Sequence, residues 1–427
     1  MDGEFSIVKK NKIDFLIVVD WLVTPMMEIG SEIGLEKALD EKEVFILIVD
    51  DYIKSEGFNT RLSKFISKYD IPKKLERIIH SKKHENIKIS LKKIDKNIKQ
   101  EFWPKEIKNV FTEIQENQLD SINKYLRSII INNVNVGEGI LSSIISNTKK
   151  IYPTYQNDKK TIKEVFNLFV RRYFMYSKFF KEDFDIENLV IFNGRYASSK
   201  AIESGISKNI KETKFLYYER SHTLNRYTLK PYKVHDRKNI INEINEFWIN
   251  SNKKNEASKI AETYFKIKIS GRGTDWFPFS KGIQENEDDF YTNQLNDYKN
   301  KKVNKIISYF SSSEDEFESL GEIWSDSRFN LSQEEIIREL SRISIKKNMK
   351  LIIRLHPNLD NASDESKTKW GEFLSKLPKN NTIIIKQDDK ISSYKIINNS
   401  DIVVVYGSTV GVEALYLKKP VIITGPS

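Results

Sequence analysis

Two short polar motifs in the last quarter of the chain have the residue types of an anion-binding site. The first is Arg-Leu-His-Pro-Asn at residues 354–358, directly after the apolar run 351–353. The second is Tyr-Gly-Ser-Thr at 406–409, directly after the apolar run 402–405. Both apolar runs have the composition of buried strands. Because ligands of open α/β sheets bind beyond the carboxyl ends of the strands, the sequence places both motifs at a ligand-binding edge.

The second motif combines a turn residue with helix-capping residues. Gly407 permits a sharp turn from strand to helix, and the hydroxyls of Ser408 and Thr409 can cap that helix. The free N–H groups of a first helical turn attract anions such as phosphate. Glu413 follows Thr409 by four residues, so it lies on the same helical face and could accept hydrogen bonds from ribose hydroxyls. The alternative is an ordinary cap followed by a solvent-facing glutamate.

The first motif is centred on His356. The proline after it ends the strand and fixes the path of the loop, which presents the histidine where a diphosphate or a leaving phosphate could accept its proton. Arg354, two residues earlier on the same strand face, is a second candidate phosphate contact. Ser312 and Ser313 end another expected strand, and their hydroxyls could bind phosphate oxygens or simply cap a loop.

Polar side chains also follow expected strands in the first half of the chain. Asn193 and Arg195 follow one expected strand, and the arginine could bind an anion. Asp20, Asp51 and Glu219 close three other strands. A carboxylate can act as a base that takes a proton from a hydroxyl, and all three qualify by position. For each, a structural cap or a salt bridge is the alternative.

Parallel strands must bring these motifs together, and the C-terminal region shows the clearest pattern of such strands. A capping box formed by Ser332 and Glu335 predicts the start of its first long helix. Further helices are expected between the strands, which we place at 305–310, 349–355, 382–386, 401–406 and 420–424. This alternation predicts a parallel, doubly wound sheet. A strand that ends at 424 would normally be covered by further helices, so we expect this domain to be truncated.

The N-terminal region repeats the strand–helix–strand order less regularly. A lysine-rich, mostly helical stretch covers residues 64–181, and 243–268 is again helical in pattern. Strands are expected at 14–20, 44–49, 189–192 and 214–218, and helices at 25–39 and 198–203. We therefore expect two domains: 1–290, with a helical, lysine-rich insertion, and 305–427.

Composition limits the classes of protein that fit. The 427 residues include no cysteine, which excludes disulfides and thiolate sites and fits a reducing cytoplasm. Five separated histidines predict no metal site. The net charge of +10 comes from scattered lysines without a nucleic-acid-binding motif. The apolar run 15–19 is too short to span a bilayer. Residues 165–180 are expected to form a buried helix, with docking on an anionic membrane as the alternative.

The combination of motifs resembles GT-B glycosyltransferases, and among them the bacterial capsule and surface-polysaccharide biosynthesis proteins. The strongest local similarity is the motif at 406–409, continued by Glu-Ala-Leu at 413–415 and Lys-Pro-Val at 419–421. The resemblance covers residues 305–427 and extends to the N-terminal region only in outline. It implies an α/β, GT-B-like fold in which two Rossmann-like parallel-sheet domains face each other across a cleft.

The resemblance also implies a function. The protein would move a sugar from a nucleotide-sugar, with CMP-linked donors as one candidate beside UDP- and GDP-sugars, to a capsule, lipopolysaccharide or other surface glycan. The acceptor would be a glycan or a lipid-linked sugar at the cytoplasmic face of the inner membrane, touched only peripherally. No metal or other cofactor and no nucleic acid would take part. The donor phosphates and ribose would be held by Ser312 or Ser313, His356, Ser408, Thr409 and Glu413. The N-terminal domain would supply the acceptor side, where Arg195 could bind an anionic acceptor or a carboxylate of the donor. An inverting transfer would need one of the three carboxylates named above as its base.

Three other functions stay open. A nucleotide-sugar 2-epimerase of related fold would carry Ser-Gly-Gly where this chain has Ser-Thr-Val at 408–410. A polyol-phosphate transferase would use similar phosphate contacts to make a different product. A non-enzymatic module would use the basic surface to bind nucleic acid or another protein.

Overall fold

The chain folds into two compact units, residues 1–240 (unit 1) and 241–427 (unit 2). The sequence places the boundary later, between 290 and 305. The computed structural model describes residues 11–21, 25–50, 86–94, 98–117, 119–180, 184–206, 212–221, 226–270, 305–321, 331–389 and 391–425. Each unit has its own sheet and its own core, and each is considered by itself below.

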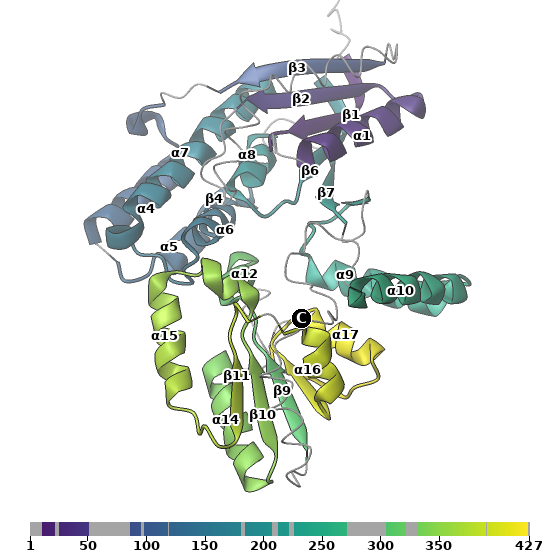
Figure 1. The fold of residues 1–427 in the computed structure, drawn as a ribbon. Coiled ribbons are helices and arrows are strands. Elements are labelled where there is room, and N and C mark those ends of the chain that lie inside the picture. Colours follow the sequence, from purple (N-terminus) through teal and green to yellow (C-terminus); the bar gives the residue numbers. More distant parts are fainter. Residues whose placement is uncertain are drawn as a thin grey trace, which may run out of the picture. The chain divides into compact units, whose positions relative to one another are not determined.

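Unit 1 is built on a six-stranded sheet (Figure 1). Its strands, in sheet order, are β3 (Ile87–Lys93), β2 (Val44–Asp50), β1 (Asn11–Val19), β6 (Phe184–Phe192), β7 (Lys214–Arg220) and β8 (Tyr227–Lys230). All neighbours are parallel except β8, which pairs antiparallel with β7. The first five strands therefore follow the Rossmann order 3-2-1-4-5 when the short hairpin β4–β5 is set aside.

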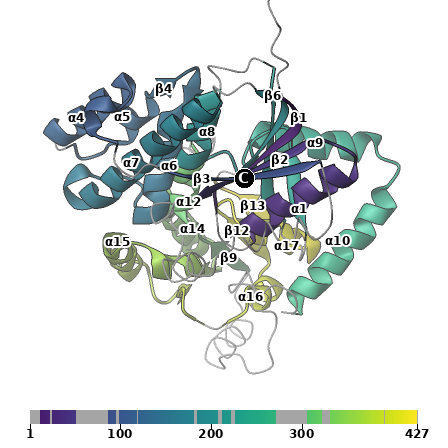
Figure 2. The ribbon, with the colours of Figure 1, turned by 90° about the horizontal axis from the view of Figure 1, so that it is seen from above.

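Helices cover both faces of this sheet (Figures 1 and 2). Leu16 and Val18 of β1 belong to the core on one face, and Ile17 and Val19 to the core on the other, as the two-residue period of a strand requires. The first face packs against α6 (Val136–Thr148), α7 (Tyr155–Phe179) and α8 (Ala197–Ile206), and the second against α1 (Met26–Leu39). The remaining elements are η1 (Gln100–Phe102), α4 (Lys105–Asn117), α5 (Asn123–Arg127), β4 (Ile130–Ile131) and β5 (Val134–Asn135).

The expected buried helix at 165–180 is confirmed. It forms the second half of α7, and Val165, Phe166, Phe169 and Tyr176 are fully buried. These side chains are part of the core of unit 1, as a helix with apolar residues on most of its circumference requires. Among the described residues, no helix combines the length and the apolar character that a bilayer span requires.

Unit 2 contains a second, wholly parallel sheet. In sheet order its strands are β11 (Thr382–Ile385), β10 (Lys350–Arg354), β9 (Ile306–Phe310), β12 (Ile402–Val405) and β13 (Val421–Ile423). This is again the order 3-2-1-4-5. The expectation of two Rossmann-like α/β units is thereby confirmed. All five strands expected in this region are present, each within two residues of its expected ends.

Helices also pack on both faces of the second sheet. The predicted capping box of Ser332 and Glu335 is present at the start of α14. One face packs against α14 (Gln333–Lys346) and α15 (Asp364–Ser375), and the other against α16 (Ser393–Asn399) and α17 (Val410–Tyr416). Two short elements follow strand ends, α12 (Glu314–Ser319) and η2 (Pro357–Asn361).

The helical pattern at 243–268 forms two helices, α9 (Arg237–Asn250) and α10 (Lys254–Ile269). The end of α10 belongs to unit 2 through side-chain contacts. The ring of Phe265 stacks on Tyr416 of α17 with centroids 4.4 Å apart, and Ile269 packs against the core beneath α16 and α17. These contacts explain why the unit boundary precedes the one expected from the sequence.

Candidate functional site

Three motif-bearing loops meet at the carboxyl edge of the unit 2 sheet. β9 lies between β10 and β12, so the loop that follows it is flanked by the other two. Backbone hydrogen bonds connect them at the strand ends: the Ser311 N–H donates to Arg354 O (3.0 Å), and the Tyr406 N–H donates to Phe310 O (3.3 Å). The sequence motifs at 311–313, 354–358 and 406–409 are therefore brought to one edge.

His356 is held in a defined orientation and tautomer. Its backbone N–H donates to Ser311 Oγ (2.8 Å), and its ring Nδ1 accepts the Asn358 N–H (3.1 Å). Because Nδ1 accepts, the proton of the neutral ring is on Nε2. Burial lowers the pKa of His356; the charge of Arg354 adds to this and that of Asp315 opposes it. The side chain is thus a neutral N–H donor at physiological pH.

The serine loop after β9 is fixed by Gln333, which the sequence did not single out. Gln333 is fully buried at the start of α14. Its Oε1 accepts the Ser312 N–H (2.8 Å), and its Nε2 donates to the Ser312 carbonyl (3.1 Å). Ser313 Oγ donates to Asp315 Oδ1 (2.5 Å) and accepts from Asn358 Nδ2 (3.0 Å). The Ser312 backbone and the Ser313 hydroxyl are therefore already bonded within the fold.

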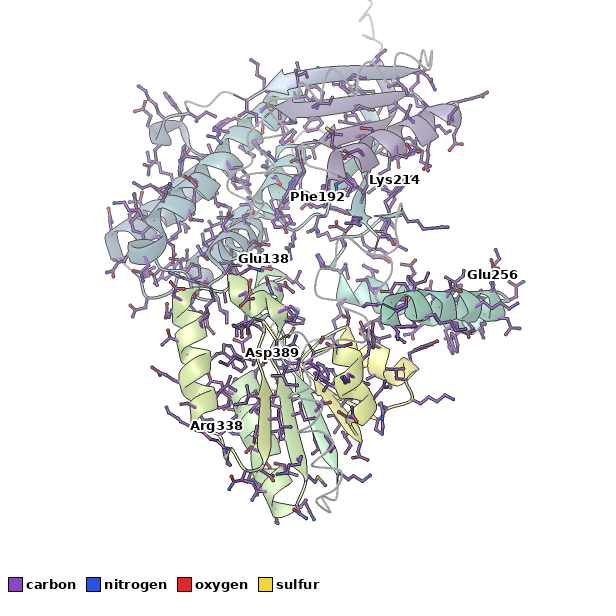
Figure 3. All side chains as sticks on the ribbon, viewed as in Figure 1. Glu138, Phe192, Lys214, Glu256, Arg338 and Asp389 are labelled. Atoms are coloured by element: carbon purple, nitrogen blue, oxygen red, sulfur yellow. The ribbon has the colours of Figure 1, made fainter. Side chains whose placement is uncertain are left out.

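Arg354 has a structural role beside its charge. Its guanidinium donates to the carbonyl of Lys386 through Nη1 and to that of Asp389 through Nη2 (3.1 Å). Figure 3 labels Asp389 in the turn that follows β11. Two donors of the predicted phosphate contact are thus occupied by backbone. The guanidinium fixes this turn beside the His356 loop, and its charge acts on the histidine from there.

The turn after β12 has the left-handed glycine that its sequence predicts, but the predicted side-chain cap of α17 is absent. Gly407 has a φ of +64°, the left-handed region that favours glycine. Ser408 Oγ accepts the Val410 N–H (3.3 Å), whereas Thr409 makes no side-chain cap. A Cβ atom on Gly411 would lie 3.1 Å from a Val405 methyl, so glycine lets α17 approach β12 closely.

Glu413, the predicted ribose ligand, is paired with a residue far away in the sequence. Only 7% of its side chain is exposed, and Oε1 accepts from Lys268 Nζ at the end of α10. Burial, together with the charge of Glu413, raises the pKa of the nearby Tyr394 hydroxyl. The buried carboxylate therefore has a half-buried ammonium partner, a feature that no local pattern indicates.

The carboxylates expected at the strand ends of unit 1 have different surroundings. Asp20 accepts Arg172 Nη1 at 2.5 Å through Oδ2, and Nη2 donates to its carbonyl (3.2 Å). Both side chains are at most 2% exposed, so Asp20 is part of a buried ion pair. Asp51 lies outside the described residues. Of the two carboxylates that the structure describes, Glu219 is the one with part of its surface exposed.

Glu219 has the environment of a tuned acid–base group. Asn193 Nδ2 donates to its Oε2 (2.5 Å), and the Arg220 N–H donates to its Oε1 (3.0 Å). Burial raises the pKa of Glu219, and this effect exceeds the opposing effects of those hydrogen bonds and of the charges of Arg195 and Arg220. Arg195 itself stacks over the Tyr196 ring at 4.4 Å. The structure thus brings three sequence candidates together: Asn193, Arg195 and Glu219.

Two further sets of titratable side chains in unit 1 were not indicated by the sequence. His235 lies 3.5 Å from Asn193 Nδ2, in a loop where no strand pattern indicated it. Behind the β6 turn, Glu203 accepts from Lys200 Nζ (2.9 Å) and from the Tyr217 hydroxyl (3.1 Å). Burial lowers the pKa of Lys200 to about 8. Within the described ranges, no set of three histidine or carboxylate side chains could hold a metal ion.

Comparison with known protein families finds a match in the region that carries the motifs. Residues 318–427 match the family of capsule polysaccharide biosynthesis proteins, which confirms that resemblance for this part of the chain. No curated protein sequence matches the chain significantly. Among solved structures, Thermosulfurimonas dismutans KpsC, beta Kdo 2,7 transferase, is 15% identical with a TM-score of 0.32, covering 56% of this chain and 65% of that chain.

A second solved structure is similarly distant. Thermosulfurimonas dismutans KpsC, beta Kdo 2,4 transferase, is 12% identical with a TM-score of 0.33, covering 58% of this chain and 74% of that chain. The chain thus spans just under two thirds of the first KpsC structure. Similarity at this level does not extend to substrate or mechanism.

Proposed function

We propose that this chain is a glycosyltransferase of capsule polysaccharide synthesis, in which unit 2 binds a nucleotide-sugar donor and unit 1 binds the acceptor. The observation that carries the proposal is the meeting of the His356 loop and the 406–409 turn at one sheet edge, within the region that matches the capsule family. In a Rossmann-like sheet this edge, where the strand order reverses between β9 and β12, is where a nucleotide binds.

His356 would contact the donor phosphate as a neutral donor. Because Nδ1 accepts the Asn358 N–H, Nε2 carries the ring proton and is the atom that would donate to a phosphate oxygen. Its lowered pKa makes a neutral hydrogen bond to the leaving phosphate the expected contribution, instead of transfer of a proton from an imidazolium. Ser408, Thr409 and the Gly407 turn would supply further donors, and a leaving group so stabilised departs more readily.

The donor we favour is CMP-linked. A histidine–proline pair together with a serine/threonine turn resembles enzymes that use such sugars, and this chain carries both motifs at one edge. The acceptor would be a growing capsule glycan or a lipid-linked sugar, reached by peripheral contact with the inner membrane. No metal is needed in this scheme, because hydrogen bonds from the chain stabilise the phosphate.

Glu219 is the base that we propose for the acceptor hydroxyl. A base must be ionised to accept a proton, so activity should rise with pH through the pKa of Glu219, which burial places above its ordinary value. Asp20 is less suited, because its Oδ2 is bonded to Arg172 in a buried ion pair. Arg195 lies near Glu219 and would attract an anionic acceptor.

Nucleotide binding tests this proposal. Melting temperatures would be measured with CMP, CDP, UDP and GDP and with their sugar conjugates, because a ligand that binds only the native state raises the melting temperature. We expect a clear shift with one nucleotide class and loss of that shift in His356→Ala. Absence of any shift in the unmodified protein would contradict the proposal.

A pair of serines separates the binding role from the local hydrogen bond that each one makes. Ser408 Oγ accepts the Val410 N–H in the turn before α17, and Ser363 Oγ accepts the Ser366 N–H as the N-cap of α15. Each serine-to-alanine change should cost about 1 kcal/mol of stability through the lost hydrogen bond. Only Ser408→Ala should also weaken the nucleotide-induced shift.

A further inference from the structure

The chain leaves β6 through two consecutive left-handed residues. The φ angle of Asn193 is +58° and that of Gly194 is +89°. Asparagine tolerates this region better than most residues with a side chain. A Cβ atom on Gly194 would lie 2.7 Å from the Tyr217 ring, so glycine is required there. The backbone is thus committed to an unusual turn at the position where Asn193 meets Glu219.

The Asn193 side chain lies between two titratable groups. It is 3% exposed, its Nδ2 donates to Glu219 Oε2 at 2.5 Å, and the same nitrogen lies 3.5 Å from His235 Nε2. A neutral imidazole can accept a hydrogen bond at one ring nitrogen. Burial lowers the pKa of His235 to about 3, with the charge of Arg195 adding to it, so the ring is neutral and can accept.

Both oxygens of Glu219 are therefore fixed. Asn193 binds Oε2, and the Arg220 N–H binds Oε1. Each oxygen retains a second lone pair for an approaching hydroxyl. The charges of Arg195 and Arg220 lower the pKa of Glu219, and the charge of Glu219 raises the pKa of Tyr218. The neutral His235 lies beyond Asn193.

We propose that Asn193 is the positioning residue of the base Glu219, with His235 as the acceptor that orients its amide. The role of Glu219 as a base rests on the proposed function, whereas the contact itself rests on geometry. The hydrogen bond prevents rotation of the carboxylate and favours its ionised form against the effect of burial. Asn193 would thus act through Glu219 instead of contacting the substrate as the sequence suggested.

Carboxyl NMR of the full chain tests the inference without a substrate. The protein would be labelled with ¹³C at the glutamate carboxyl carbon, and the Glu219 resonance identified by its loss in Glu219→Gln. Asn193→Gly keeps the left-handed backbone and removes the amide. We expect the pKa of Glu219 to rise by about one unit or more, because a hydrogen bond to the charged form is lost. His235→Ala should raise it less.

Asn132 offers a matched control in the same unit. It also has a left-handed φ of +50°, and its amide donates to the Ser204 carbonyl at 2.8 Å. Asn132→Gly should leave the Glu219 titration unchanged. An unchanged or lowered pKa of Glu219 in Asn193→Gly would overturn the inference.

The transfer reaction gives a second readout that separates the two claims. In Asn193→Gly, the acidic limb of kcat/KM against pH should move to higher pH and the plateau should fall, because the base is harder to ionise and its carboxylate is no longer held in one orientation. A lower plateau with an unmoved limb would indicate a merely structural role and contradict the inference. Full activity of Glu219→Gln would instead show that Glu219 is not the base, and the NMR result on its hydrogen bond with Asn193 would still hold.

Discussion

Asp20 and Glu219 show how one chemical group at two strand ends acquires two roles. Asp20 follows β1 and Glu219 lies at the end of β7, and the sequence treated them alike. The structure buries Asp20 against Arg172, 152 residues away in the chain, and leaves Glu219 partly exposed between Asn193 and Arg220. Residue type and strand position predict candidate sites, but pairing across such separations depends on the folded structure.

The buried pair gives a stability prediction at this scale. Arg172→Met should lower the free energy of unfolding of unit 1 by about 3–5 kcal/mol, because Asp20 then loses its buried counter-charge. Urea denaturation followed by tryptophan fluorescence measures this. The exposed Arg338, which pairs with Glu334 at 3.9 Å, is the control, and Arg338→Met should change stability by less than about 1 kcal/mol. Equal effects of the two substitutions would contradict the assignment.

At the scale of elements, the sequence predicted strands best where they are short apolar runs. All five strands of unit 2 are of this kind, the edge strands β11 and β13 included, and each was expected from its composition. β3 and β8 were missed. Both are edge strands, and β3 carries lysines at positions 88 and 92, which suit a solvent-facing edge and hide the apolar alternation.

The attachment of α10 to α17 is an element-scale feature that the sequence did not reveal. It depends on the Phe265–Tyr416 stack and on the ion pair of Lys268 with Glu413. The residues of α10 and their partners on α17 lie more than a hundred positions apart, and no local sequence pattern connects them. The helix was expected, whereas its partner could not be.

This attachment predicts unequal roles for two neighbouring lysines of α10. Lys268→Met should lower the melting temperature of the protein clearly, because Glu413 would stay buried without its ammonium partner. Lys266 pairs with Glu262 on the exposed face of the same helix, and Lys266→Met should change stability by no more than about 0.5 kcal/mol. Differential scanning calorimetry of both variants decides, and a larger loss in Lys266→Met would refute this account of α10.

At the scale of the whole molecule, two units share the strand order 3-2-1-4-5. In each, the candidate residues lie at the carboxyl edge of the sheet: Glu219 and Asn193 in unit 1, His356 and Ser408 in unit 2. The alternation of strands and helices was sufficient to predict this architecture. It could not predict where one unit ends, because the contacts that attach α10 to unit 2 are made by side chains distant in sequence. The arrangement across a cleft stays a prediction.

The central claim is that the chain transfers a sugar from a nucleotide to a glycan, and product formation tests it most directly. The unmodified protein would be incubated with CMP-, UDP- and GDP-sugars and a capsule oligosaccharide, and the products analysed by mass spectrometry. We predict extension by one sugar with one donor class, and a loss of about 10²-fold or more in Glu219→Gln, as expected for removal of a general base. Absence of extension with every donor, or full activity of Glu219→Gln and His356→Ala together, would contradict the account.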